Sequence, residues 1–173
     1  MDALDAVLTR RSIRRYSDSP VSEALVTQLL RAAMAAPSAR NQQPWRFIVV
    51  RDRAQLAALA TAQPNAGMVG QAQVAVVVCA DLDLVKSEGF WVQDCAAATE
   101  NLLIAAHALG LGAVWSGTYP REERVARVGE VVGLPANVVA FAVVPIGYPA
   151  EHPAPAERFD SERIHLDHYQ EGA

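Results

Sequence analysis

Residues 94–109 (DCAAATENLLIAAHAL) constrain the fold more than any other part of the chain. They are small or apolar almost all round, and the polar exceptions are Asp94, Thr99, Glu100, Asn101 and His107. A helix of this kind cannot lie on a solvated surface, so other elements or another subunit must cover it. Its alanines would let a partner approach closely. We interpret the segment as the core helix of a dimer, with the core helix of a single chain as the alternative.

Hydrophobic periodicity and capping residues predict helices and strands along the rest of the chain. Ser22 is placed to cap a helix over 22–35, which Pro37 ends. The run 73–80 (QVAVVVCA) is continuous and rich in β-branched residues, as in a strand buried on both faces. The other expected elements are helices at 53–62, 93–109 and 122–131 and strands at 45–51, 113–118 and 138–146.

The composition is that of a single domain spanning residues 1–173. A net charge of −4 argues against a nucleic-acid partner, because basic residues dominate no extended region. No stretch approaches the roughly 20 apolar residues of a membrane span, and the acidic N-terminus is unlike a secretory signal. Cys79 and Cys95 lack CxxC spacing, which indicates reduced core thiols. We therefore expect a cytoplasmic protein without a membrane partner.

The end of the chain cannot pack on itself. Three prolines between 149 and 155 favour an extended conformation, yet apolar residues follow at Phe159, Ile164, Leu166 and Tyr169. An arm that crosses to a neighbouring subunit would bury these residues, and a frayed terminus is the alternative.

Residues 10–15 (RRSIRR) place four arginines just past a short amphipathic segment. Arg10, Arg11 and Arg14 can converge there, and Ser12 adds a hydroxyl. A guanidinium binds phosphate through two parallel hydrogen bonds, which a lysine cannot do. The cluster is therefore a candidate phosphate site, with a solvated helix terminus as the alternative.

The loop at 37–45 (PSARNQQPW) joins an expected helix to an expected strand. Two prolines restrict its backbone, and three amides and a hydroxyl supply uncharged donors and acceptors. Such a loop suits the edge of a flat heteroaromatic ring, where amides match carbonyls and ring nitrogens.

Four separated motifs resemble the flavin-dependent nitroreductase family, in the order and spacing of that family. They are RRSIRRY at 10–16, APSARNQQPWRF at 36–47, ENLLIAAHALGLGAVWSG at 100–117 and PIGYP at 145–149. The resemblance implies a three-layer α+β fold with a mostly antiparallel sheet flanked by helices. It also implies an intertwined homodimer with exchanged C-terminal arms that holds FMN in clefts between the subunits.

The resemblance also implies roles for individual residues. The phosphate and ribityl contacts fall on Arg10, Arg11, Ser12 and Arg14, with Arg158 of the tail as a further phosphate contact. The loop that reaches the flavin from the partner subunit supplies Pro37, Ser38, Ala39, Asn41 and Gln43. The strand end beside the reactive edge of the flavin supplies Trp115, Ser116 and Gly117.

In this family FMN carries the redox chemistry, so no catalytic side chain and no metal are expected. The implied activity is ping-pong reduction of nitroaromatics, quinones or similar small acceptors by NAD(P)H. Alternatives on the same fold are dehalogenation, dehydrogenation, flavin cleavage or flavin binding without catalysis, because a fold does not fix a function.

The acceptor pocket is less constrained. The segment 81–91 is short, which indicates an open site with Phe90 and Trp91 as lid residues or as ordinary core packing. Arg40 faces either the pocket, where it would favour anionic substrates, or the solvent. His107 is expected to be buried and hydrogen-bonded.

Two motif-like patterns are rejected. Gly110-Leu111-Gly112 follows a helix, so it is a helix stop and not a dinucleotide fingerprint. The spacing of HLDH at 165–168 fits no usual zinc site.

Overall fold

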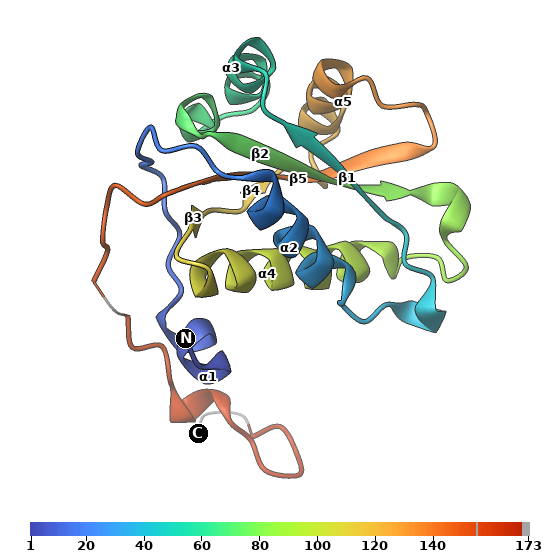
Figure 1. Ribbon diagram of the computed structural model, residues 1–173. Coiled ribbons are helices and arrows are strands. Elements are labelled where there is room, and N and C mark those ends of the chain that lie inside the picture. Colours follow the sequence, from blue (N-terminus) through green and yellow to red (C-terminus); the bar gives the residue numbers. More distant parts are fainter. Residues whose placement is uncertain (155, 171–173) are drawn as a thin grey trace.

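The computed structural model describes residues 1–154 and 156–170, and they form an α+β fold in three layers (Figure 1). The middle layer is a five-stranded sheet in the order β1-β2-β5-β3, with β4 also paired to β5. Its strands are β1 (Trp45–Val50), β2 (Val74–Asp81), β3 (Gly112–Ala113), β4 (Ser116–Gly117) and β5 (Val138–Gly147). All pairs of these strands are antiparallel, which confirms the expected fold class.

Helices cover both faces of the sheet. α2 and α4 pack together on one face, and α3 and α5 pack together on the other (Figure 1). The helices are α1 (Ala3–Thr9), α2 (Glu23–Met34), α3 (Arg53–Ala62), α4 (Trp91–Ala108) and α5 (Glu122–Val132). None of the described helices is long and apolar enough to cross a membrane.

The apolar run of β2 explains the two-sided sheet. Side chains alternate between faces along a strand, so Val74, Val76 and Val78 pack toward α2 and α4. Ala75, Val77 and Cys79 pack into the second core, toward α3 and α5. β2 therefore lies at the centre of both cores, as its continuous apolar sequence predicted.

Local capping signals set the starts of two helices. The Ser22 hydroxyl accepts a hydrogen bond from the Leu25 N–H at the start of α2, at 3.3 Å. The Asp52 carboxylate accepts one from the Gln55 N–H at the start of α3, at 2.9 Å. Both helices begin within a residue of the expected position because these contacts are encoded locally.

The expected strand at 113–118 is wrong, because two short strands occupy this region. β3 pairs Gly112 with Gly147, and β4 pairs Ser116 with Val143 in the same register. In that register Val114 lies opposite Pro145, which has no N–H to donate. The ladder of hydrogen bonds is therefore interrupted between β3 and β4.

α4 is buried only on part of its circumference within one chain. It begins at Trp91, two residues before the expected start, and its fully buried side chains include Leu102 and Ala106. Ala97 and Ile104 remain half-buried. Other large apolar side chains are exposed on α1 and the arm: Leu4, Val7, Leu8, Phe159, Ile164, Leu166 and Tyr169. A single chain thus leaves its most apolar helix, its first helix and its arm incompletely covered.

The close approach of β3 to the arginine-rich segment predicts the effect of a single methyl group. A Cβ at Gly112 would lie 2.6 Å from Cγ2 and 2.8 Å from Cβ of Ile13. Because Ile13 is buried and cannot move freely, we expect Gly112→Ala to lower the free energy of unfolding by about 1–3 kcal/mol.

Denaturant unfolding of the apoprotein measures this loss. Gly67→Ala is the matched control, since a Cβ there meets no atom within 4 Å. Equal stability of the two variants would contradict the predicted clash.

Candidate functional site

The backbone of the arginine-rich segment is fixed on both sides. The Ile13 N–H donates to the Ala113 carbonyl at 3.0 Å, beside β3. On the other side, the Ala150 N–H donates to the Arg15 carbonyl at 2.9 Å, next to the end of β5. The Tyr16 hydroxyl donates to the Ile13 carbonyl at 2.6 Å, and burial raises the pKa of this phenol, so it remains a donor. The segment is therefore a rigid edge of the fold.

The three arginines expected to converge do not share a partner within one chain. Arg10 forms an ion pair with Glu100 of α4, with 3.1 Å between Nε and Oε1. The Arg11 guanidinium donates to carbonyls of the arm, including that of Ala154 at 3.1 Å. Arg14 is exposed, and in the described part of the chain it forms no ion pair. Within one chain Arg10 and Arg11 therefore bind different partners, and the convergence of the three side chains stays a prediction.

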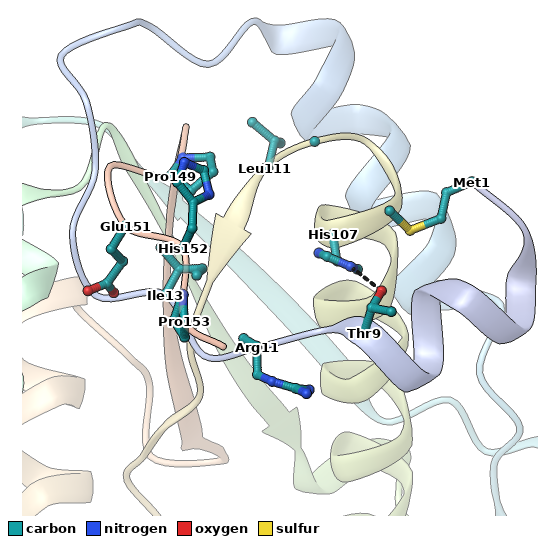
Figure 2. Close-up of a pocket in the computed structure, with 11 residues that line it drawn as sticks. Met1, Thr9, Arg11, Ile13, His107, Leu111, Pro149, Glu151, His152 and Pro153 are labelled. Carbon is teal, nitrogen blue, oxygen red and sulfur yellow. Dashed lines mark hydrogen bonds between the residues drawn. The ribbon is translucent and has the colours of Figure 1, made fainter. Parts of the chain in front are cut away.

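Arg11 lines a cavity of about 250 Å³ between α1, the end of α4 and the start of the arm (Figure 2). Here Thr9 Oγ1 lies 2.8 Å from His107 Nε2. Desolvation and then the charges of Arg10 and Arg11 lower the pKa of His107. His107 is hydrogen-bonded as expected but only half-buried, so the expectation of a buried histidine is wrong.

Gly117 lies at an open edge of the sheet, a few residues after the strand that pairs with Ser12 and Ile13. The Thr118 N–H donates to the Phe141 carbonyl of β5, so the peptide groups of Gly117 point away from β5. The Gly117 carbonyl accepts from Arg124 at 3.1 Å, which agrees with this orientation. A Cβ at Gly117 would meet only Trp115 Nε1, at 3.9 Å. A ligand can therefore approach this backbone closely.

Gln63, at the end of α3, braces the same strand end. Its Nε2 donates to the Ser116 hydroxyl at 2.7 Å, and its Oε1 accepts from the Thr118 hydroxyl at 3.0 Å. Gln63 is 3% exposed and Thr118 is fully buried. Both side chains need these bonds, because a buried polar group without a partner is destabilising.

The loop after α2 adopts an unusual backbone. Arg40, Asn41 and Gln43 have φ values of 50°, 53° and 46°, which non-glycine residues rarely adopt. The Ser38 hydroxyl accepts from the Gln43 N–H at 3.0 Å, and the Asn41 side chain accepts from the Gln43 side chain at 3.0 Å. The turn displays exposed amides of Asn41 and Gln43 in a fixed arrangement.

The start of α4 anchors this loop. Asp94 Oδ1 accepts from the Ala39 N–H at 2.9 Å, and Oδ2 accepts from Gln42 Nε2 at 2.6 Å. Gln42 Oε1 accepts in turn from the backbone N–H groups of Lys86 and Ser87, at 2.8 and 2.9 Å. The loop, α4 and the segment before α4 are thus joined by one buried polar network.

Two of the three expected groups of site residues lie together in one chain, and the third lies apart. Ser12 bridges to Ala113 of β3, which places the arginine-rich segment a few residues along the chain from Trp115 and from Ser116 and Gly117 of β4. The turn at 39–41 lies near the opposite end of α4 from α1 (Figure 1). Asp94 contacts this loop, and Glu100 contacts Arg10. At 3.6 residues per turn these two positions lie roughly 120° apart around α4.

The aromatic residues near the start of α4 form a cluster. Trp91 packs edge-on against Tyr119, with 4.7 Å between ring centroids, and lies 6.4 Å from Phe141. This packing favours a core role for Trp91 over a lid role. Phe90 is 48% exposed, so it remains available to an acceptor pocket. The Arg40 side chain is exposed.

The remaining candidate groups give no nucleophile or metal centre. Burial raises the pKa of both Cys79 and Cys95 to about 12, so these thiols stay protonated at neutral pH. Residues 1–154 and 156–170 contain no cluster of three His, Cys, Asp or Glu side chains suited to a metal ion. His165 instead packs its ring 4.5 Å from that of Tyr169. Arg158 is exposed on the arm.

Sequence reasoning missed Asp94, Gln42 and Gln63. Asp94 carried a signal, because it is an acidic residue on an almost wholly apolar helix. Gln42 carried a weaker one as the middle amide of the loop. Nothing near Gln63 in the sequence indicates its partners, which lie more than fifty residues away.

Comparison with known proteins identifies the fold as that of one family. The model of the nitroreductase family matches residues 7–90 and 60–148. The chain belongs to the nitroreductase family. A Methanothermobacter thermautotrophicus protein, whose provisional name joins NADH dehydrogenase and NAD(P)H nitroreductase, is 51% identical over 167 residues. The match covers 96% of this chain and 87% of that protein.

Solved nitroreductases also share the fold of this chain. An FMN-dependent nitroreductase from Clostridium difficile R20291 aligns with a TM-score of 0.89 and 27% identity. This alignment covers 96% of this chain and 99% of that one. A Desulfovibrio desulfuricans protein, provisionally a nitroreductase and solved in complex with FMN, aligns with a TM-score of 0.85 and 34% identity. That alignment covers 98% and 99% of the two chains.

The bridge made by Gln63 predicts a clear stability effect. Gln63→Leu removes both hydrogen bonds and leaves the buried Thr118 hydroxyl without its partner. We expect the free energy of unfolding to fall by about 1–3 kcal/mol.

Denaturant unfolding measures this effect, and a Gln63→Leu, Thr118→Val double variant tests its cause. The double variant removes the unpaired hydroxyl and should recover part of the loss. A double variant with the summed losses of both single variants would contradict a direct bond.

Proposed function

We propose that this chain is an FMN-dependent NAD(P)H oxidoreductase that acts as a homodimer, with residues 1–173 as one FMN-binding domain. The observation that carries the proposal is the open, braced strand end at Gly117, which lies beside the arginine-rich segment in a fold that holds FMN in the Desulfovibrio desulfuricans protein. Such a site combines an anion-binding edge with a backbone that a flat ring can approach.

The residues of this chain fit the phosphate of FMN. Arg14 has an exposed guanidinium on a fixed backbone, and Ser12 lies one residue before the buried Ile13. Arg10 would exchange Glu100 for the phosphate. A partly exposed ion pair contributes only about 0–1 kcal/mol, whereas a bidentate arginine–phosphate contact is stronger, so this exchange is favourable. Further contacts would come from Arg11, which binds the arm, and from Arg158 on the arm itself.

The ring of FMN fits the strand end and the loop. In the proposed complex the Gly117 N–H would donate to the ring, beside Trp115 and Ser116. Arg124 donates to the Gly117 carbonyl and so would help to fix this backbone. Pro37, Ser38, Ala39, Asn41 and Gln43 would meet the ring edge from the other side. Their amides supply donors and acceptors for ring carbonyls and nitrogens.

A second copy of the chain would complete this site. The loop and Arg10 contact different sides of α4, and α1, α4 and the arm leave apolar side chains uncovered. Two copies packed through α4 would bury these side chains and bring the loop of one copy to the arginines of the other. Exchanged C-terminal arms would cover the remainder of the exposed apolar surface.

When bound, FMN supplies two-electron transfer from NAD(P)H to an acceptor. The role of this chain is to hold the ring, to leave one ring face open to donor and acceptor in turn, and to offset the negative charge of the reduced state through nearby donors. The alternating use of one face gives ping-pong kinetics. Phe90 would favour flat aromatic acceptors such as nitroaromatics and quinones, and Arg40 would favour anionic ones.

Purification and steady-state kinetics test the proposal together. We expect a yellow protein that releases FMN on denaturation and sediments as a dimer. It should oxidise NADH or NADPH when a quinone or a nitroaromatic is present, with parallel double-reciprocal lines. A colourless protein that does not take up added FMN, or a flavoprotein inert toward both donors, contradicts the proposal.

Replacing the phosphate contacts tests the site. The double variant Arg10→Ala, Arg14→Ala removes two charge-assisted contacts, each worth about 1.5–3 kcal/mol. The dissociation constant for FMN should therefore rise at least about 100-fold. FMN fluorescence titration measures the change.

Arg15→Ala is the matched control, because Arg15 is a neighbouring exposed arginine with no assigned role. Unchanged FMN affinity in the double variant would remove these arginines from the site.

A further inference from the structure

We propose that Asp94 and Gln42 are positioning residues that hold the loop at 38–43 in the conformation that receives FMN. The inference rests on the proposed function. It assigns a role to a buried carboxylate and a buried amide that are not among the proposed flavin contacts. Asp94 is 4% exposed and Gln42 is 5% exposed, so their bonds are shielded from water.

The direction of every hydrogen bond in this network is fixed by its outer members. Lys86 and Ser87 present backbone N–H groups, which can only donate, so Gln42 must turn Oε1 toward them. Gln42 then presents Nε2, a donor, to Asp94. Asp94 must also accept from the Ala39 N–H. Asp94 accepts on both side-chain oxygens, whereas an asparagine would offer one oxygen and one NH₂ group, so the site requires aspartate and not asparagine.

The network acts against an unfavourable backbone. Arg40, Asn41 and Gln43 all have φ near 50°, in the left-handed region that L-residues avoid. The bonds at Ala39 and Gln42 lie within the same turn and hold it from inside. Without them we expect the turn to relax toward ordinary backbone angles, which would change how Asn41 and Gln43 present their amides.

The network also joins the flavin loop to the segment that the proposed function places beside the acceptor. Lys86 and Ser87 precede Phe90, the residue before α4, and their N–H groups are held by the amide that binds Asp94. The Asp94 carboxylate at the start of α4 therefore sets the position of both the loop at 38–43 and the segment that leads to Phe90. The helix N-terminus also favours a negative charge there.

The fixed polarity allows a charge-swap experiment. In Asp94→Asn the new amide can be turned in two ways. In one its NH₂ group faces Gln42 Nε2 and in the other it faces the Ala39 N–H, so a donor meets a donor in both. Gln42→Glu places a second carboxylate against Asp94. The double variant restores the pattern, because the carboxylate introduced at position 42 accepts from Lys86, Ser87 and the new asparagine, while the asparagine oxygen accepts from Ala39. The net charge of the double variant equals that of the natural chain.

Two measurements on each variant test the inference. FMN affinity, from fluorescence titration, should fall about tenfold or more in each single variant and return to within about threefold of the natural value in the double variant. Hydrogen exchange of the apoprotein should speed up at 38–43 and 85–90 in the single variants and slow again in the double variant. Asp52→Asn is the control, because it removes the same charge where asparagine also caps a helix.

Each outcome decides the inference. Natural FMN affinity in both single variants overturns it, as does a double variant that fails to fold or exchanges as fast as the single ones. If a single variant does not fold, a folded double variant with slow exchange still supports the network. A natural protein that binds no FMN refutes the proposed function alone, since the exchange data test the network without the flavin.

Discussion

The burial of α4 against the sheet is the constraint on which the rest of this structure depends. Its alanines and leucines form the centre of the larger core together with β2, β5 and α2. Because the helix is nearly apolar all round, α2 and the sheet cannot cover it completely. The uncovered part, together with α1 and the arm, is the physical reason to expect a second copy.

The few polar residues of α4 place the site on this apolar frame. Asp94 holds the loop at 38–43, Glu100 holds Arg10, and His107 holds Thr9 at the end of α1. Each of these polar side chains therefore orients a different segment around the proposed cofactor site. The strand end at Gly117 is braced independently, by Gln63 and Arg124. Rigid backbone with little catalytic side-chain chemistry is consistent with a protein whose cofactor carries the reaction.

The limits of sequence reasoning follow from the range of the interactions. The starts of α2 and α3 were predicted well because Ser22 and Asp52 bond three residues ahead. The strand at 113–118 was predicted as continuous, and it is not, because Pro145 across the sheet interrupts it. The arginines were expected to converge, and the sequence did not indicate that in one chain Arg10 binds Glu100 while Arg11 binds the carbonyl of Ala154.

The sequence by itself determined the three layers, the two-sided burial of β2 and the membership of the family, because these depend on periodicity, caps and motifs that are written locally. Only the tertiary structure decided which side chains hold the loop at 38–43 and the strand end at Gly117. Asp94 meets Gln42, and Gln63 meets Ser116 and Thr118, across about fifty residues of chain. Donor–acceptor pairing of buried groups is satisfied by whatever the fold brings near, so it leaves little trace in the order of the residues.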